Sequence, residues 1–305
     1  MKRFNFKLFF FILPIIIFAF LLEFALRMIP NDYVYKKELL DKGAHQIETL
    51  ILGNSHIYTG LNPTYLENKN AFNAAYFSQT LYFDNEIFKK YQDQTPQLKT
   101  VIISVSYASL FYTFGYAGDY FLYWDFDVES MKFFDKTEIL GMGKTFSANM
   151  KRVFRYYIKR ESPITSTELG WGNFYKSEES KNLLETGKET AKKHEKNMDL
   201  KMVDTNVDLI NSIINTCKQR NIHVLLITMP TYQSYRDNIN NEYLNIALTT
   251  AGNIAQKHEN CTYLNLHEDA SFVVEDFYDG DHLNDIGAKK LSLLVNKTLD
   301  EIINK

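Results

Sequence analysis

Short apolar stretches alternate with amphipathic stretches along most of the chain. The apolar runs, rich in β-branched residues, are Thr49–Leu52, Ala71–Tyr76, Thr100–Val105, His223–Met229 and Thr262–Leu266. Apolar residues recur at helical spacing in four other segments, which are residues 81–91, 207–218, 241–258 and 285–303. Strands that alternate with helices predict a parallel sheet covered by helices on both faces. The pattern therefore predicts a three-layer α/β/α domain.

The alternation stops between about residues 107 and 200. This insertion begins with a dense aromatic run from Tyr107 to Trp124 and ends in a charged stretch from Lys176 to Lys201. We interpret it as an aromatic-rich helical cap or subdomain beside the active face, and not as a separate domain. Its rings could form ordinary core, the commoner use of aromatic side chains, or a platform for the faces of sugars.

The first thirty residues have a different pattern. An uncharged apolar run from Leu8 to Leu22 continues to Ile29, interrupted by Glu23 and Arg27. A helix of about 20 residues is long enough to cross the apolar core of a bilayer. Glu23 and Arg27 are four residues apart on one helical face, where they could pair or reach the interface. We predict a single membrane-spanning anchor at residues 1–30, followed by an α/β domain at residues 31–305.

Charge near the amino terminus predicts the orientation of this anchor. Lys2, Arg3 and Lys7 precede the apolar run, and basic residues tend to stay on the cytoplasmic side. Residues 31–305 are therefore expected on the extracytoplasmic side of the cell membrane. A cleavable signal peptide is the alternative, but the apolar run is long for one and no small-x-small cleavage site stands out.

Composition excludes some classes of protein. The chain has 305 residues, a mass of 35.7 kDa, a net charge of −3 and a pI near 6.2, which gives no reason to expect a nucleic-acid partner. Cys217 and Cys261 are the only cysteines, so neither a disulfide framework nor a thiolate metal site is expected. Whether these two cysteines pair is left open.

The first candidate for chemistry is Ser55, which follows the apolar run that ends at Leu52, in the segment Gly53-Asn54-Ser55-His56. A serine on the turn after a buried strand has backbone N–H groups near it that could hold an oxyanion. The alternative is that Ser55 only caps a turn or a helix.

The second candidate is the segment Asp279-Gly280-Asp281-His282, just before the last predicted helix. Spacing of three residues on a loop lets the Asp279 carboxylate accept a hydrogen bond from the His282 imidazole. The acidic residues could instead serve only as turn and cap residues. Because Ser55 also follows a strand of the same pattern, we expect Ser55, His282 and Asp279 to form a catalytic triad.

These two segments resemble the conserved blocks of the SGNH/GDSL hydrolase superfamily. Gly53-Asn54-Ser55 stands where the first block carries the nucleophilic serine, and Asp279-x-x-His282 stands where the final block carries the acid and base. The sequence from Gly53 to Pro63, together with Leu283-Asn284, is most similar to that of membrane-anchored members that act in envelope biosynthesis. The resemblance covers residues 47–106 and 205–303 and implies a flavodoxin-like fold with a parallel sheet.

The resemblance also implies a function. Ser55 would attack an ester carbonyl, His282 would take its proton, and Asp279 would orient His282. The protein would then be a serine acyl esterase or O-acyltransferase that acts on an acylated envelope glycan, with a membrane acyl-donor protein as a further partner. Whether water or a sugar hydroxyl accepts the acyl group is left open. The alternative is a catalytically inactive glycan-binding or assembly protein of the cell envelope.

The donors of the oxyanion hole depart from the family pattern. The usual glycine of the second block is absent, and the third block lacks its Gly-x-Asn motif. The residues expected to bind the oxyanion or the substrate are Asn54, His56, Ala75, Ser78, Gln79, Ser106 and Tyr107.

Two histidines and a possible metal site complete the candidates. His56 could contact substrate or could be a turn residue bonded to backbone. His194, in a basic segment, is expected to face solvent, with the alternative that it reaches the site. His56, Asp279, Asp281 and His282 could be imagined as metal ligands, but their spacing favours a triad. We therefore predict neither a metal nor a cofactor.

Overall fold

The computed structural model describes residues 2–112, 118–124, 126, 133–141 and 144–303. The chain forms two compact units, each built from two segments. The first consists of residues 1–38 and 116–164, and the second of residues 39–115 and 165–305. The predicted insertion at about 107–200 is thus divided between the two units.

The second unit contains a five-stranded parallel sheet with the strand order β2-β1-β3-β4-β5. Its strands are β1 (Thr49–Leu52), β2 (Ala71–Asn73), β3 (Thr100–Ser104), β4 (His223–Thr228) and β5 (Cys261–Asn265). This is the order of flavodoxin-like sheets, in which ligands bind beyond the carboxyl ends of the strands. The predicted α/β fold with a parallel sheet is confirmed, although several strands end earlier than predicted.

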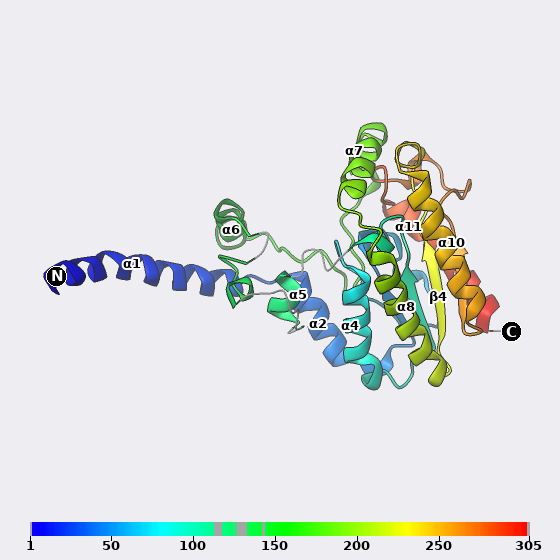
Figure 1. Ribbon diagram of the computed structural model, residues 1–305, viewed down its shortest axis with the longest axis horizontal. Helices are drawn as coiled ribbons and strands as arrows, with labels where there is room; N and C mark the ends of the chain where they lie inside the picture. Colours follow the sequence, from blue (N-terminus) through cyan, green and yellow to red (C-terminus); the bar gives the residue numbers. More distant parts are fainter. Residues whose placement is uncertain (1, 113–117, 125, 127–132, 142–143, 304–305) are drawn as a thin grey trace. The chain divides into compact units, whose positions relative to one another are not determined.

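Helices cover both faces of this sheet. One face carries α4 (Leu81–Tyr91), α8 (Met202–Gln219) and α10 (Asn241–Lys257), of which α8 and α10 run beside β4 in Figure 1. The other face carries α3 (Ser55–Gly60) and α11 (Asp285–Ile303), which contact each other. Right-handed crossovers between parallel strands require this division of the helices. Apolar residues of α3 and α11 share a buried core with the sheet; they include Ile57, Leu61, Leu291 and Val295.

Residues 165–200 belong to the same unit and pack near the end of α3. The Tyr58 hydroxyl is 2.8 Å from Ser166 Oγ, and the Trp171 indole N–H donates to the Thr59 carbonyl at 2.7 Å. Further along, α7 (Leu183–Lys196) packs against the short helix α9 (Gln233–Arg236). This part of the predicted insertion therefore contributes side chains next to the carboxyl ends of the strands.

The first unit joins the amino-terminal helix to part of the insertion. It contains α1 (Lys2–Arg27), the start of α2 (Asp32–Gly43), α5 (Gly118–Tyr123) and α6 (Phe146–Val153), which continues as a π-helical turn to Ile158. The predicted pair between Glu23 and Arg27 is present at 2.7 Å. The Glu23 carboxylate also accepts the backbone N–H groups of Glu138 and Ile139 at 2.9 and 3.0 Å. These bonds fix the insertion to the end of α1.

Within the part of the chain that the structure describes, α1 is long and apolar enough to cross a membrane. The candidate span, Leu8–Arg27, has a mean hydropathy of 2.7. Its large side chains are exposed, as at Phe11 (71%) and Phe20 (74%). A helix that is apolar and uncovered in this way suits a lipid environment.

The aromatic residues of the insertion mostly form core. Tyr107 and Phe111 are buried in the second unit, and Tyr120, Trp124 and Phe126 are buried against one another in the first. Phe114 and Tyr116 lie outside the described residues. These rings therefore belong to the core, whereas Tyr112 of the same run lines a pocket beside Ser55.

The two cysteines are buried and free, so the disulfide left open by the sequence is not formed.

Candidate active site

The position of Ser55 depends on a glycine that no other residue could replace easily. Gly53 follows β1 with a φ of +137°, a region that L side chains rarely adopt. A Cβ atom at Gly53 would lie 2.7 Å from Ser104 Cβ and 2.9 Å from Ile57 Cγ2. The chain therefore turns tightly against β3, and α3 begins at Ser55. Asn54 caps this helix by accepting the His56 N–H at 3.1 Å.

Asp279 organises the loop before α11. Its Oδ1 atom accepts the backbone N–H groups of Asp281 and His282 at 3.2 and 2.9 Å, and it lies 2.9 Å from His282 Nδ1. Since a carboxylate only accepts, Nδ1 carries a proton and the other ring nitrogen is free to act on Ser55. His282 Nε2 lies 2.9 Å from Ser55 Oγ. The structure thus brings Ser55, His282 and Asp279 together in hydrogen-bond contact, as expected from the sequence.

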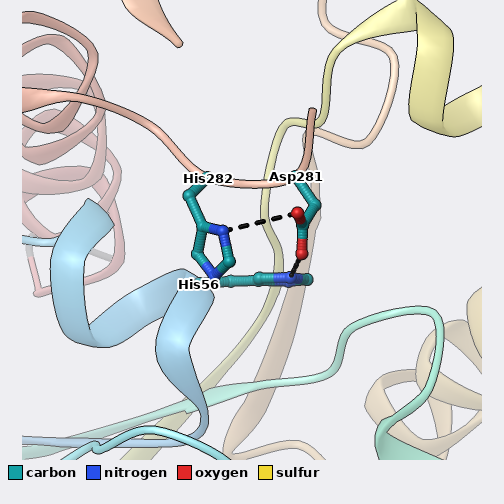
Figure 2. Close-up of side chains that lie close together, drawn as sticks. All are labelled: His56, Asp281 and His282. Atoms are coloured by element: carbon teal, nitrogen blue, oxygen red, sulfur yellow. Dashed lines mark hydrogen bonds and ion pairs between the residues drawn. The ribbon is translucent and has the colours of Figure 1, made fainter. Parts of the chain in front are cut away.

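A second carboxylate, Asp281, joins two histidines of the site. Its Oδ2 lies 3.0 Å from His56 Nε2, and its Oδ1 lies 3.4 Å from His282 Nδ1, as Figure 2 shows. Asp281 is 2% exposed, so these contacts lie in a weakly screened environment. From the sequence, Asp281 was expected to be a turn or cap residue, and a role as metal ligand was considered less favourable than a triad. No spacing signal distinguishes it from the other acidic residues of that loop.

These charges shift the acidity of the site. Burial lowers the pKa of His282, but the carboxylates of Asp281 and Asp279 outweigh burial and raise it to about 10. Burial also opposes ionisation of Asp281, yet His282 and His56 hold the pKa of that carboxyl well below its usual value. The pair therefore favours an imidazolium beside two carboxylates, the state that a triad forms when serine loses its proton.

A pocket of about 530 Å³, including its open mouth, lies next to Ser55. Six of the predicted site residues line it, namely Asn54, Ser55, His56, Ser78, Gln79 and Ser106. Asn54 Nδ2 donates to Ser106 Oγ at 2.9 Å, and Ser106 Oγ lies 2.9 Å from Ser109 Oγ. The carboxyl ends of β1 and β3 are therefore joined by a chain of polar side chains.

Two predicted residues lie elsewhere. The Ala75 N–H donates to Asn73 Oδ1 at 3.0 Å, so it is already occupied by its own turn. Tyr107 is buried in a neighbouring core cluster, where its hydroxyl accepts the Asn240 N–H at 3.1 Å. Neither residue lines the pocket beside Ser55.

A buried carboxyl group, Asp84, lines the pocket and was not predicted. Burial raises its pKa to about 7, although hydrogen bonds from the Gln79 side chain and the Gly53 backbone act in the opposite direction. Gln79 Nε2 donates to Asp84 Oδ1 at 2.6 Å. Gln79 is thus held by Asp84 on α4. The apolar residues at helical spacing in residues 81–91 predicted only a packed helix, so the sequence did not indicate a role for Asp84.

His194 does not face solvent as the sequence suggested. It lines the pocket, and its Nδ1 lies 2.8 Å from the hydroxyl of the buried Tyr235. Burial, together with the nearby histidines, lowers the pKa of His194 to about 4, although Asp281 acts in the opposite direction. The packing of α7 on α9 brings His194 to the site, and the local charge pattern gave no sign of it. Tyr112, a further pocket residue from the aromatic run, lies beside its ring.

His56, Asp281 and His282 offer ligand atoms within 4.8 Å of one another, a geometry that could hold a metal ion. However, both ring nitrogens of His282 already have partners, Asp279 and Ser55. His56 Nε2 is likewise bonded to Asp281. A metal would have to displace these hydrogen bonds, so the arrangement suits proton transfer better than metal binding.

Comparison with known proteins gives weak similarities. No protein-family model matches the sequence, and no curated protein matches it significantly. Among solved structures, a GDSL-like lipase from Bacteroides thetaiotaomicron is similar over 89% of this chain and 100% of its own, with a TM-score of 0.43 and 10% identity.

Two other structures are similar to the same degree. One, provisionally named a platelet activating factor from Streptococcus pneumonia, has a TM-score of 0.45 and 10% identity over 88% of this chain and 91% of its own. The other, provisionally named an acylhydrolase from Bacteroides fragilis, has a TM-score of 0.43 and 10% identity over 86% and 96%. Similarities of this size do not indicate an activity, and the fold class rests on the sheet order.

Proposed function

We propose that the protein is a membrane-anchored serine acyl esterase or O-acyltransferase that works through an acyl-enzyme on Ser55. The observation that carries this proposal is the chain of contacts from Ser55 Oγ to His282 Nε2 and from His282 Nδ1 to Asp279, each 2.9 Å long. A hydroxyl, an imidazole and a carboxylate in this order can convert a weak oxygen nucleophile into a strong one.

In the first half-reaction, neutral His282 takes the proton of Ser55 as Oγ attacks the ester carbonyl. The tetrahedral intermediate collapses when His282 returns that proton to the departing alcohol, which leaves an acyl group on Ser55. In the second half-reaction, His282 takes a proton from the acceptor, water or an alcohol, and then returns it to Ser55. Asp279 and Asp281 stabilise the imidazolium in both steps.

The oxyanion needs donors close to Ser55. The Ser55 N–H lies in the first turn of α3, where backbone donors have no partner within the helix. Ser78, a pocket residue held at a φ of +51°, offers a second backbone N–H from the loop between β2 and α4. We infer that these two groups hold the oxyanion and that Gln79, already bonded to Asp84, supports their turn.

The membrane helix and the family resemblance together suggest where the enzyme works. An α/β unit tethered to a bilayer, with basic residues before the tether, would face the extracytoplasmic side. A substrate confined to the envelope, such as an acylated glycan, would meet it there. A membrane acyl-donor protein would be a natural partner if the acceptor is a sugar hydroxyl.

Labelling with a fluorophosphonate probe tests the nucleophile directly. The full-length protein in detergent micelles should be modified at Ser55, and Ser55→Ala should abolish that modification. Ser212→Ala, which changes an exposed serine on α8, is the matched control and should label normally. Failure of well-folded wild-type protein to react at Ser55 would favour the catalytically inactive alternative.

A further inference from the structure

Three buried polar atoms near Ser55 have no hydrogen-bond partner among the described residues. They are His56 Nδ1, Thr80 Oγ1 and Ser104 Oγ, and all three residues line the pocket beside Ser55. Buried polar groups in native proteins are nearly always bonded, so each exception calls for an explanation. Three such atoms around one pocket are groups that a bound polar ligand could satisfy.

Each of the three residues is held in place by other contacts. The Nε2 atom of His56 faces Asp281, which only accepts, so Nε2 carries a proton and Nδ1 is the ring nitrogen left for a ligand. Thr80 is the N-cap residue of α4, yet its hydroxyl makes no capping bond. Ser104 ends β3 against the Gly53 turn. The unused groups therefore come from a strand end and two helix starts around one pocket.

The rest of the pocket has a mixed lining. Hydroxyl or amide groups come from Asn54, Ser106 and Ser109, and apolar surface comes from Leu81, Ala108 and the ring of Tyr112. An acyl chain placed here would leave the three polar groups unpaired, whereas a ligand that carries hydroxyl groups could bond to them.

We propose that this pocket binds the hydroxyl-rich alcohol part of the ester, such as a sugar ring or another polyol, through His56, Thr80 and Ser104. His56 Nδ1 accepts a hydrogen bond from one substrate hydroxyl. The Thr80 and Ser104 hydroxyls can donate to or accept from others. The acyl group is then small or points out of the pocket. This inference rests on the proposed function for its orientation relative to Ser55.

Binding can be tested without catalysis. In full-length Ser55→Ala protein in detergent micelles, saturation-transfer NMR should detect methyl 6-O-acetyl-glucoside but not hexyl acetate. Adding Thr80→Val and Ser104→Ala, which remove two hydroxyls at nearly constant volume, should abolish the sugar signal. Thr80→Ser keeps the hydroxyl and should retain the signal. Thermal melting of each variant checks that it is folded.

Kinetics provide the second readout. For Thr80→Val or Ser104→Ala, kcat/KM for the acetylated glucoside should fall about tenfold, the effect of leaving one buried partner unpaired. On p-nitrophenyl acetate, which has no polyol, the same variants should lose several-fold less activity than on the glucoside. An equal loss on both substrates would mean that the residues only maintain the site, and the proposal would be wrong.

The outcomes separate this inference from the proposed function. If Ser55 is not labelled but the sugar signal still depends on Thr80 and Ser104, the pocket is a glycan-binding site in a protein without acyl chemistry. If Ser55 is labelled and the sugar signal is unaffected by these substitutions, ordered water alone occupies the three groups. That result would overturn the inference and leave the esterase proposal intact.

Discussion

The two ends of the parallel sheet both carry pockets, but they differ in chemistry. At the amino ends of β1 and β3, a pocket of about 670 Å³ including its mouth is larger than the 530 Å³ pocket beside Ser55. Its charges are paired locally. Lys69 Nζ lies 2.7 Å from Asp300 Oδ1, and Lys99 pairs with Glu48. Both lysines that line this pocket are therefore paired with carboxylates.

At the carboxyl ends, the ionisable groups are histidines and carboxylates within a buried network. His282 is shared between Asp279 and Asp281, and its other nitrogen reaches Ser55. A proton can therefore move among groups that are already aligned. The comparison shows that the volume of a pocket says less about function than whether its polar groups remain available.

The largest contrast is expected from removing one key side chain at each end. Ser55→Ala should lower kcat for p-nitrophenyl acetate by roughly 10³-fold or more, since a triad without its nucleophile retains only the residual effect of binding. Lys69→Met should leave turnover within about twofold, because it lies outside the reacting network. Initial rates of the two folded variants measure these two effects. A similar loss in both would remove the distinction between the ends.

Neutralising one carboxylate at each end gives a smaller but sharper contrast. Asp279→Asn keeps the shape of the side chain but cannot orient His282 in the same tautomer, so kcat should fall roughly 10²- to 10⁴-fold. Asp300→Asn is the matched change at the amino end, and steady-state kinetics should show no such loss. If Asp279→Asn retained full activity, the order of the proposed triad would be wrong.

The pH profile tests the second carboxylate. Because the pKa of His282 is raised to about 10, its neutral, base-competent fraction should grow with pH, and kcat/KM should rise through the neutral range. Asp281→Asn removes one negative charge beside the ring and should lower that pKa. The ascending limb should then move to lower pH, so activity near pH 7 falls less than at pH 9 or even increases. A uniform loss without a shift would assign Asp281 a packing role.

The smallest effect is expected at the exposed end of the sheet. Lys99→Met removes an ion pair whose lysine is 64% exposed. Exposed pairs contribute about 0–1 kcal/mol, so the free energy of unfolding measured by urea denaturation should change by no more than that. A larger loss of unfolding free energy would show that the ion pair between Lys99 and Glu48 contributes substantially to the stability of the fold.

Much of the fold follows from local sequence pattern. The β-branched runs identified all five strands, and the period of α4 and α11 predicted their bounds, Leu81–Tyr91 and Asp285–Ile303. By contrast, α8 begins at Met202, five residues before the predicted start at 207, and its first turns include the polar run Asp204-Thr205-Asn206. The partition of the insertion was not predictable, since it depends on contacts with α1 that lie far away along the chain.

The candidate site was predicted in part for a similar reason. Ser55, Asp279 and His282 stand in recognisable local motifs, and their meeting follows from strand order. Asp281 and His194 do not carry such a signal. Their contribution depends on tertiary packing, through the bridge to His56 and the contact with Tyr235. Residues that act through their neighbours are invisible to spacing arguments.

The attachment of the insertion to α1 matters for anyone who wishes to study the protein without its membrane helix. Leu22, Leu26 and Ile29 form one apolar cluster with Met150, Val153 and Tyr156, and the Tyr157 hydroxyl donates to the Ala25 carbonyl. Removing residues 1–30 would expose the apolar side chains of Met150, Val153 and Tyr156 to solvent. The shortened protein should aggregate through these side chains, whereas a protein that begins near residue 20 would keep them partly buried.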